Sequence, residues 1–232
     1  MAEQRTVVGL LLAAGAGRRM GGPKALVGPL AGQESPVSRV AGWMHSGGCE
    51  QVVVVIGARA GDVRASLPSL PWLSIAEATD WSHGMGASLR AGLARATAGN
   101  ASAALITLVD LPDVRADVFE RLLATAGPGS TDDSILARAV YQGRPGHPVL
   151  IGRSWWAAAA DLARGDKGAR ELFATLPHRR VECGDLASGE DADLPPSGVE
   201  ADLPPAGRKA HLPPSGEDSE LPPAAATPQP DV

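Results

Sequence analysis

The apolar residues of this chain form short continuous runs, separated by stretches in which apolar positions recur every three or four residues. Three of the runs are apolar on both faces, as expected of central strands buried on both sides. These runs cover residues 7–12, 51–57 and 103–109. Weaker strand patterns follow at residues 72–76, 135–140 and 147–151.

Helical spacing fills the segments between these runs, at residues 36–44, 62–67, 86–97, 116–126, 154–162 and 168–176. Ser35 followed by Pro36 predicts the start of the first helix, and Asp62 predicts the cap of the second. Strands and helices that alternate at these lengths predict a three-layer α/β fold. Its Rossmann-like sheet should be mostly parallel, with helices on both faces.

The first predicted strand leads directly into a glycine-rich loop, residues 13–24, which also carries Arg19 and Lys24. Glycine lets backbone N–H groups approach an anion closely, and the two cations supply charge that glycine lacks. The loop therefore predicts a cradle for nucleotide phosphates. It is not a Walker A motif, since neither Ser nor Thr follows Lys24. Taken alone, it also fits an ordinary strand-to-helix turn.

A carboxylate follows the strand predicted at residues 103–109. Asp110 stands where that run ends, and Pro112 stops the strand shortly afterwards. Ligands of parallel sheets bind beyond the carboxyl ends of the strands, so Asp110 is expected to face the phosphate loop. The two would repel each other without a cation between them, and Mg²⁺ suits both carboxylate and phosphate oxygens. The alternative is that Asp110 only shapes the turn.

Composition narrows the class of protein. A formal charge of −5 over 232 residues argues against a general nucleic-acid surface, so cations that bind phosphate must be local. The two cysteines, Cys49 and Cys183, have no metal-ligand spacing and suit a reducing cytoplasm. No apolar segment reaches the length of a membrane span. We expect a soluble cytoplasmic protein without nucleic-acid or membrane partners.

The end of the chain repeats a Leu-Pro-Pro pattern with a period of nine residues, beginning near residue 193. Each repeat contains too little apolar surface to offset the entropy lost on ordering. We therefore expect a folded domain over residues 1–195 and an extended, disordered tail over residues 196–232.

Four segments resemble the molybdopterin nucleotidyltransferase family, and more closely its cytidylyltransferase branch. They occur in the family's order across residues 5–195, which isolated motifs rarely do by chance. The segments are Leu12-Ala13-Ala14-Gly15 with Arg19-Met20-Gly21 and Lys24, Asp80-Trp81-Ser82-His83-Gly84-Met85-Gly86-Ala87-Ser88-Leu89, Val109-Asp110-Leu111-Pro112, and Gly143-Arg144-Pro145-Gly146-His147-Pro148-Val149-Leu150. The resemblance implies the nucleotide-diphospho-sugar transferase type of α/β fold.

The resemblance also implies an activity, the transfer of CMP from CTP to the terminal phosphate of molybdopterin with release of pyrophosphate and with Mg²⁺ as cofactor. In this family an Ala-Ala-Gly loop, here residues 13–15, accompanies CTP, whereas a Gly-Gly loop accompanies GTP. The catalytic residues would be Arg19, Lys24 and Asp110, of which Asp110 also holds the metal. The nucleotide-binding residues would be Leu12, Ala13, Ala14, Gly15, Ala16, Gly17, Arg19, Lys24, Ser88 and Asp110.

Three residues are candidates for the side of the acceptor, molybdopterin. His147 could donate to it, although a histidine beside proline is as typical of a structural turn. Lys167 and Arg170 fall in the first turn of a predicted helix, where a bound anion would compensate their charge. They also fit a solvated helix end.

Relatives often end in an Asp-Ile-Asp-Thr-Pro element whose second acidic residue helps to hold the metal. The similar segment here is Asp191-Ala192-Asp193-Leu194-Pro195. Asp193 is therefore the expected second ligand of Mg²⁺, with Asp191 as the alternative. Two departures stand out, because relatives often carry Asn at the place of Ala78 and Ser at the place of Gly17.

Three other functions remain open. The loop alone permits transfer to another phosphate or phosphosugar, although the Gly-His-Pro segment at residues 146–148 argues against it. Some members of the family are NAD(P)H-dependent oxidoreductases acting on a nicotine-derived pigment, but the acidic ribose ligand and glycine spacing of a dinucleotide fold are absent. The protein could also bind the matured cofactor and deliver it to a molybdenum hydroxylase apoenzyme, docking through its tail.

Overall fold

The computed structural model describes residues 6–17, 21–26, 34–126 and 133–191. Arg19, Asp193 and the predicted tail lie outside this part. The elements in chain order are β1 Val7–Leu12, α1 Pro36–Ser46, β2 Gln51–Ile56, α2 Ala60–Ala65, β3 Leu73–Glu77, the 3₁₀ turn η2 Trp81–His83, α3 Met85–Thr97, β4 Ala103–Leu108, α4 Ala116–Ala124, β5 Leu136–Tyr141, β6 Arg144–Gly152, η3 Arg153–Trp155, α5 Trp156–Leu162, η4 Gly165–Lys167, α6 Arg170–Thr175 and β7 Arg179–Glu182.

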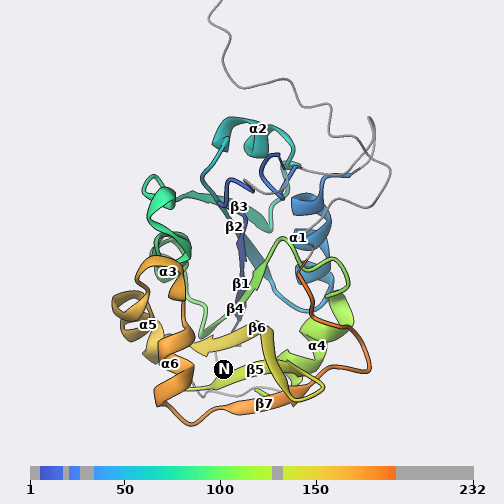
Figure 1. The fold of residues 1–232 in the computed structure, drawn as a ribbon, viewed down its shortest axis with the longest axis vertical. Helices are drawn as coiled ribbons and strands as arrows, with labels where there is room; N and C mark the ends of the chain where they lie inside the picture. The colour runs from blue at the N-terminus through green and yellow to red at the C-terminus, as the bar shows by residue number, and fades with distance from the viewer. Residues whose placement is uncertain (1–5, 18–20, 27–33, 127–132, 192–232) are drawn as a thin grey trace, which may run out of the picture. The chain divides into compact units, whose positions relative to one another are not determined.

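The strands of the described part form one seven-stranded sheet in the order β3-β2-β1-β4-β6-β5-β7 (Figure 1). Four neighbouring pairs are parallel, and β6 runs antiparallel to both of its neighbours. The predicted mostly parallel α/β sheet is therefore confirmed. Its antiparallel part comes from the β5–β6 hairpin, whose two strands the sequence analysis placed without pairing them.

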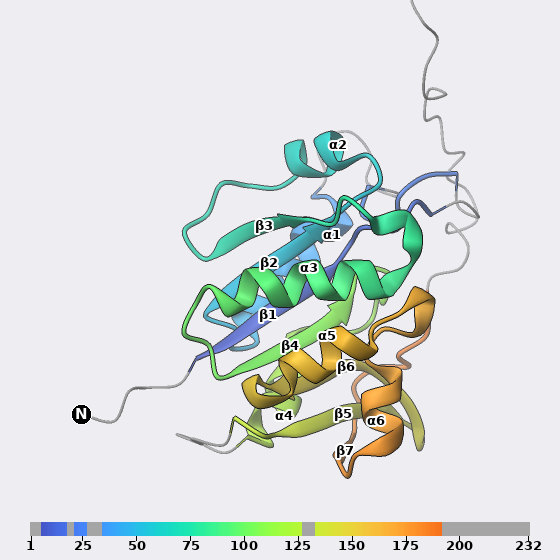
Figure 2. The same ribbon diagram turned by 90° about the vertical axis from the view of Figure 1, so that its left-hand side faces the viewer.

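Helices cover both faces of the sheet, as Figures 1 and 2 show from two directions. On one side lie α1 and α4, and on the other lie α3, α5 and α6. Strand β1 shows how the sequence dictates this, because Leu11 packs in the core of the first side while Leu10 and Leu12 pack in that of the second. Among the described helices, none combines the length and apolar character needed to cross a membrane.

The cap predicted from the sequence is confirmed for α1 but is wrong for α2. The Ser35 Oγ accepts a hydrogen bond from the Ser38 N–H over 3.3 Å, as a capping hydroxyl should. For α2, however, the prediction that Asp62 is the cap is wrong. The cap is Arg59, whose backbone is left-handed at φ +51°, and Asp62 lies within the first turn, where it accepts from the Arg59 Nε over 2.6 Å.

The C-terminal third departs most from the predicted boundaries. Strand β6 begins at Arg144 rather than His147, because the hairpin pairing continues to Arg144 opposite Tyr141. Strand β7 was not predicted. It is a short edge strand of four mostly exposed residues, three of them charged, and within the described ranges it pairs only with β5. It therefore carries no apolar periodicity. The helix predicted at residues 154–162 is divided between η3 and α5.

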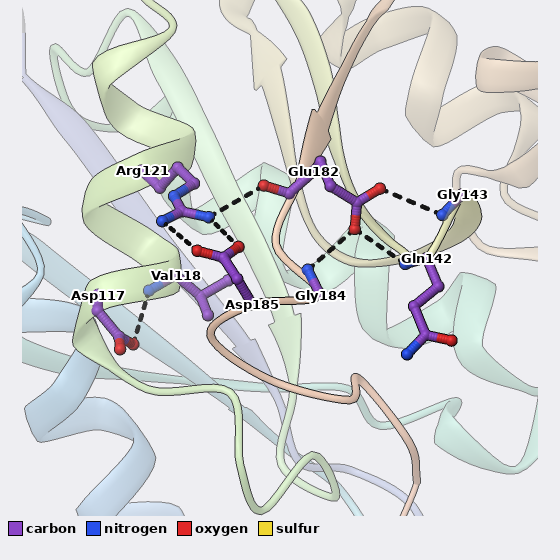
Figure 3. A network of polar contacts seen from close by, with 8 residues as sticks. All are labelled: Asp117, Val118, Arg121, Gln142, Gly143, Glu182, Gly184 and Asp185. Carbon is purple, nitrogen blue, oxygen red and sulfur yellow. Dashed lines mark hydrogen bonds and ion pairs between the residues drawn. The ribbon is translucent and has the colours of Figure 1, made fainter.

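The turn of the β5–β6 hairpin is held by a carboxylate from β7 (Figure 3). Gln142 and Gly143 form the turn with φ values of +51° and +76°. Their N–H groups donate to the Glu182 carboxylate over 2.8 and 3.1 Å, and the Gly184 N–H donates to it over 2.9 Å. These three backbone donors hold the pKa of Glu182 below its ordinary value.

A second contact fastens the same end of β7 to a helix. Arg121 of α4 forms a bidentate ion pair with the Asp185 carboxylate and also donates to the Glu182 carbonyl over 3.1 Å (Figure 3). The hydrogen bond and charge of Asp185 raise the pKa of Arg121, and those of Arg121 lower the pKa of Asp185. The edge strand is thus held by these polar contacts in addition to the packing of Val181 against the core.

We predict that Glu182→Gln lowers the melting temperature at pH 7, because the amide cannot replace the anionic acceptor of three N–H groups. A carboxylate whose pKa is depressed by folding stabilises the protein above its unfolded pKa, about 4.3. That stabilisation is lost as the pH falls through the folded value. The difference in melting temperature between wild type and variant should therefore shrink on acidification below about pH 4.

Thermal unfolding between pH 3 and pH 8 measures this difference. The control is Glu120→Gln, since Glu120 is exposed on the neighbouring helix α4. An equal loss of melting temperature in both variants would contradict the assigned role of Glu182.

Candidate active site

A cleft of about 450 Å³ opens at the carboxyl ends of β1 and β4, at the centre of the sheet. From β1 the sheet grows through β2 and β3 on one side and through β4 on the other. At such a switch point the loops of neighbouring strands diverge, and open α/β sheets bind ligands there. The cleft is lined by Leu12, Ala14, Gly15, Ala16, Gly17, Lys24, Trp81, Ser82, Gly84, Met85, Ser88, Leu108, Val109, Asp110 and Asp166.

The glycine-rich loop has a conformation that only glycine fits at residue 17. Gly17 has a φ of +56°, and a Cβ on it would lie 1.8 Å from the carbonyl oxygen of Gly22. The Gly22 N–H donates to the Gly17 carbonyl over 3.3 Å and closes the loop. The departure from the Ser frequent in relatives is therefore required by the backbone of this chain.

Of the described loop residues predicted to bind the nucleotide, Ala13 is buried in the core and the others line the cleft. Ala13 is only 1% exposed, does not line the cleft and donates its N–H to the Val55 carbonyl over 2.9 Å. It extends the pairing of β1 with β2 and so anchors the loop to the sheet. The other described loop positions of the prediction line the cleft, namely Leu12, Ala14, Gly15, Ala16, Gly17 and Lys24.

Helix α3 begins at the cleft. Ser88, expected near the nucleotide, lies in its first turn, is 6% exposed and lines the cleft together with the glycine-rich loop. Ala78, at the place of an Asn in relatives, is 1% exposed and packs in the core instead. Gly84, just before the helix, has a φ of +104°, and a Cβ on it would lie 2.5 Å from the carbonyl carbon of Gly165. The backbone just before α3 therefore packs directly against the backbone of η4.

Lys24 supplies a cation between the phosphate loop and Asp110. Its Nζ lies 2.9 Å from the Asp110 Oδ2, and the two side chains are 22% and 18% exposed. The pair joins the loop after β1 to the end of β4, 86 residues apart in sequence. The repulsion expected between Asp110 and an anion-binding loop is thus compensated by the loop's own lysine.

The other carboxylate oxygen, Asp110 Oδ1, is buried and has no hydrogen-bond partner among the described residues. Leaving a buried oxygen unpartnered is unfavourable, and a divalent cation would satisfy it. Within the described ranges, no three His, Cys, Asp or Glu residues gather into a metal site. Asp110 therefore fits a cation such as Mg²⁺, which takes one or two carboxylates and completes its shell with water and substrate phosphate.

A second pocket, of about 400 Å³, adjoins the cleft and shares Met85, Leu108 and Asp166 with it. The three residues expected on the acceptor side, His147, Lys167 and Arg170, all line this pocket. They reach it from β6, η4 and α6. The prediction of one helix at residues 168–176 with both cations in its first turn is wrong, because Lys167 lies in the separate turn η4 and α6 begins only at Arg170.

His147 is uncharged at neutral pH. Burial lowers its pKa to about 4, the positive charge of Arg138 acts in the same direction, and the negative charge of Asp110 acts against it. A neutral imidazole can both donate and accept a hydrogen bond. The backbone of His147 is held by Tyr141, whose hydroxyl donates to the His147 carbonyl over 2.6 Å.

The segment after β7 closes the second pocket, and Asp113 holds it there. The Asp113 Oδ2 accepts from the N–H and Oγ of Ser188, at 2.6 and 2.7 Å. Gly189 and Asp191, just beyond Ser188, line the pocket. Asp191 therefore lies in the wall of the second pocket, beside the residues expected to bind the acceptor.

Sequence reasoning missed several lining residues. Trp81, Met85 and Asp166 line the cleft, and the first two belong to the segment 80–89, from which only Ser88 was singled out. Arg138 lines the second pocket. It had a signal in the sequence, since it is the one charged residue inside an otherwise apolar strand pattern at residues 135–140.

Comparison with known proteins places these features in a family. The model of the MobA-like NTP transferase domain matches residues 9–181, which include the glycine-rich loop, Asp110 and the second pocket as far as Phe173. Nicotine blue oxidoreductase of Paenarthrobacter nicotinovorans is 39% identical over 197 residues, which cover 81% of this chain and 92% of that protein.

Two mycobacterial structures are similar in fold. A homologue of Mycobacterium tuberculosis Rv0371c from Mycobacterium sp. strain JC1 superposes with a TM-score of 0.64 and 26% identity, covering 81% of this chain and 90% of that one. Rv0371c of Mycobacterium tuberculosis H37Rv, solved in complex with manganese, gives a TM-score of 0.61 and 26% identity, covering 77% and 88%.

We predict that Lys24 and Asp110 are energetically coupled. For a partly buried ion pair, Lys24→Met, Asp110→Asn and the double variant should give a coupling free energy on the order of 1 kcal/mol. Urea unfolding of the four proteins measures it. The exposed pair of Lys167 and Glu171 is the control, with an expected coupling of about 0.3 kcal/mol. Strictly additive effects at Lys24 and Asp110 would show that the contact does not stabilise the fold.

Proposed function

The chain belongs to the family of MobA-like NTP transferase domains, and we propose that it transfers CMP from CTP to the terminal phosphate of molybdopterin, releasing pyrophosphate. One observation carries the proposal, namely that the ion pair of Lys24 and Asp110 lies in a cleft that adjoins a cation-lined pocket. Nucleotidyl transfer brings two anionic substrates together at one phosphorus. Its catalysis is mostly positioning and neutralisation of charge, which this arrangement supplies.

In the proposed reaction the loop binds the triphosphate. The backbone of residues 14–17 approaches the nucleotide closely, as glycine and alanine permit, and Arg19 and Lys24 contact its phosphates. When the triphosphate binds, the Lys24 ammonium contacts a phosphate oxygen, either in place of Asp110 or in addition to it. No covalent nucleophile is needed, because the acceptor phosphate itself attacks the α-phosphorus in line.

Asp110 holds the divalent cation in this proposal, through the buried Oδ1 that has no partner in the described part of the chain. The manganese complex of Rv0371c supports a divalent ion, and we propose Mg²⁺. Bound there, the ion neutralises charge on the transferred phosphate. Asp191 lines the neighbouring pocket, and Asp193, two residues further, is the proposed second carboxylate.

The choice of CTP and molybdopterin is supported by two segments. Ala13-Ala14-Gly15 is the loop form that accompanies CTP in the family, and Gly146-His147-Pro148 is similar to the acceptor segment of the cytidylyltransferase branch. The acceptor then lies in the second pocket, where Lys167 and Arg170 supply positive charge and neutral His147 can donate a hydrogen bond.

The Paenarthrobacter relative, an oxidoreductase by name, favours oxidoreduction as a second candidate function. The resemblance described above would make NAD(P)H the cofactor. The end of β2 argues against it. Dinucleotide folds carry an acidic ribose ligand there, but this chain has Gly57, and a Cβ on it would lie 2.7 Å from the Trp81 side chain and 2.8 Å from the Ala14 Cβ. A larger residue would not fit at Gly57, so we rank oxidoreduction second.

The proposed activity predicts pyrophosphate release from CTP that depends on molybdopterin and Mg²⁺, and much less release from GTP or ATP. A coupled pyrophosphate assay with each nucleotide, with and without molybdopterin, measures it. Asp110→Asn should reduce the rate at least about 100-fold. Consumption of NADPH with a pigment substrate, together with no pyrophosphate from any nucleotide, would support oxidoreduction instead. Tight binding of the matured cofactor without turnover would support delivery.

Three substitutions test the second carboxylate. Asp193→Asn should raise the Mg²⁺ concentration for half-maximal rate by about 10- to 100-fold, because one ligand is weakened. Asp202→Asn, at the equivalent place in the next repeat, should leave it unchanged. Equal losses in these two variants, or a loss in Asp191→Asn alone, would contradict the assignment to Asp193.

A further inference from the structure

Arg138 is a partly buried cation at the wall of the second pocket. It projects from β5 between Ala137 and Ala139, which are fully buried on the opposite face. Its guanidinium carbon lies 5.3 Å from the centroid of the Phe173 ring. This cation–π contact places the guanidinium against the ring and leaves its N–H groups available for hydrogen bonds.

The charge of Arg138 is poorly compensated by the protein. Among the described residues it forms no ion pair, its only hydrogen bond is a long contact of 3.5 Å to the Gly146 carbonyl, and its buried Nε has no partner. Burial lowers the pKa of Arg138, and the positive charges of Arg170 and Arg180 lower it further. A partly buried cation near two others is unfavourable unless an anion joins them.

Two other cations, Lys167 and Arg170, and two carboxylates, Asp166 and Asp191, line the same pocket. Lys167 already pairs with Glu171 over 2.5 Å, so part of its charge is compensated. Arg170 lines the pocket with Arg138, and no carboxylate contacts it within the described ranges. Two arginines facing one pocket match a group with several anionic oxygens, because each guanidinium offers a fork of N–H donors.

We propose that Arg138, together with Arg170, binds the phosphate of the acceptor in the second pocket and so restricts the acceptor to organic phosphates. The proposal rests on the proposed function only in assigning this pocket to the acceptor. The second pocket shares Met85, Leu108 and Asp166 with the cleft that contains Asp110. A phosphate bound at Arg138 therefore lies in the pocket next to the carboxylate proposed to hold the metal.

Binding of inorganic phosphate tests the site without turnover. Ring resonances of His147, assigned with His147→Gln, report the titration at pH 7. Arg138→Met removes the charge and the fork, so the dissociation constant reported by His147 should rise about 10- to 100-fold. Arg138→Lys keeps the charge but loses the fork, and should weaken binding at least about fivefold. An anion at Arg138 should also raise the pKa of His147 from about 4 in wild type and not in Arg138→Met.

The matched control is Arg180→Met. Arg180 is exposed on β7, donates to the Gly143 carbonyl and does not line the pocket. This variant removes one nearby positive charge and should bind phosphate within about twofold of wild type. Equal weakening in Arg138→Met and Arg180→Met would overturn the proposal, since binding would then follow general charge and not a defined site.

Kinetics separates this inference from the proposed function. If nucleotidyl transfer occurs, Arg138→Met should raise the KM for the acceptor about 10- to 100-fold and leave the KM for CTP unchanged. An unchanged acceptor KM would overturn the role of Arg138 while the proposed function stands. If no transfer occurs but phosphate binding still requires Arg138, the proposed function fails and the phosphate site remains.

Discussion

The site depends on one electrostatic constraint, the pairing of Lys24 with Asp110 across the centre of the sheet. Strands β1 and β4 are parallel neighbours, so the loops that follow them must meet at the same edge. The loop after β1 is rich in glycine, which suits anions, and the loop after β4 carries the Asp110 carboxylate. The two loops are compatible because Lys24 of the first donates to the Asp110 Oδ2 of the second. The Asp110 Oδ1 has no partner in the described part of the chain and can bind a cation. The sheet topology therefore determines the charges that the site must balance.

The antiparallel end of the sheet adds the second half of the site. A wholly parallel sheet would need a crossover to reach β6, whereas the hairpin of β5 and β6 brings Arg138 and His147 to one pocket from adjacent strands. Besides the apolar packing of Tyr141, Cys183 and Ala187 in the core, two carboxylates hold this edge. Glu182 binds the hairpin turn, and Asp113 binds the segment that carries Asp191. Polar contacts thus help to fix the second pocket, while the first cleft lies at the ends of the buried strands β1 and β4.

The features predictable from sequence are those with a local physical signature. The runs that became β1, β2 and β4 are buried on both faces, and Ser35 with Pro36 marks a helix start in the residues themselves. The prediction that Asp62 caps α2 is wrong because the cap is Arg59 in a left-handed conformation, for which the sequence contains no signal. Strand β7 is stabilised by partners far away in the chain and has no periodicity to detect. The glycine loop and Asp110 were found as separate motifs, but their connection through Lys24 is a distance that only the fold supplies.

The charge distribution explains how an acidic chain can hold anionic ligands. The formal charge is −5, yet at physiological ionic strength charges are screened beyond about 8 Å, so the total says little about one pocket. Lys24 and Arg138 are both partly buried, where screening is weaker than at the surface. The charges of their neighbours differ, because Lys24 pairs with a carboxylate whereas Arg138 has other arginines nearby. An anion entering the cleft must compete with Asp110 for Lys24, whereas in the second pocket, although Asp166 and Asp191 also line it, Arg138 forms no ion pair among the described residues. Two adjoining pockets of the same site can therefore differ in affinity for the same phosphate group.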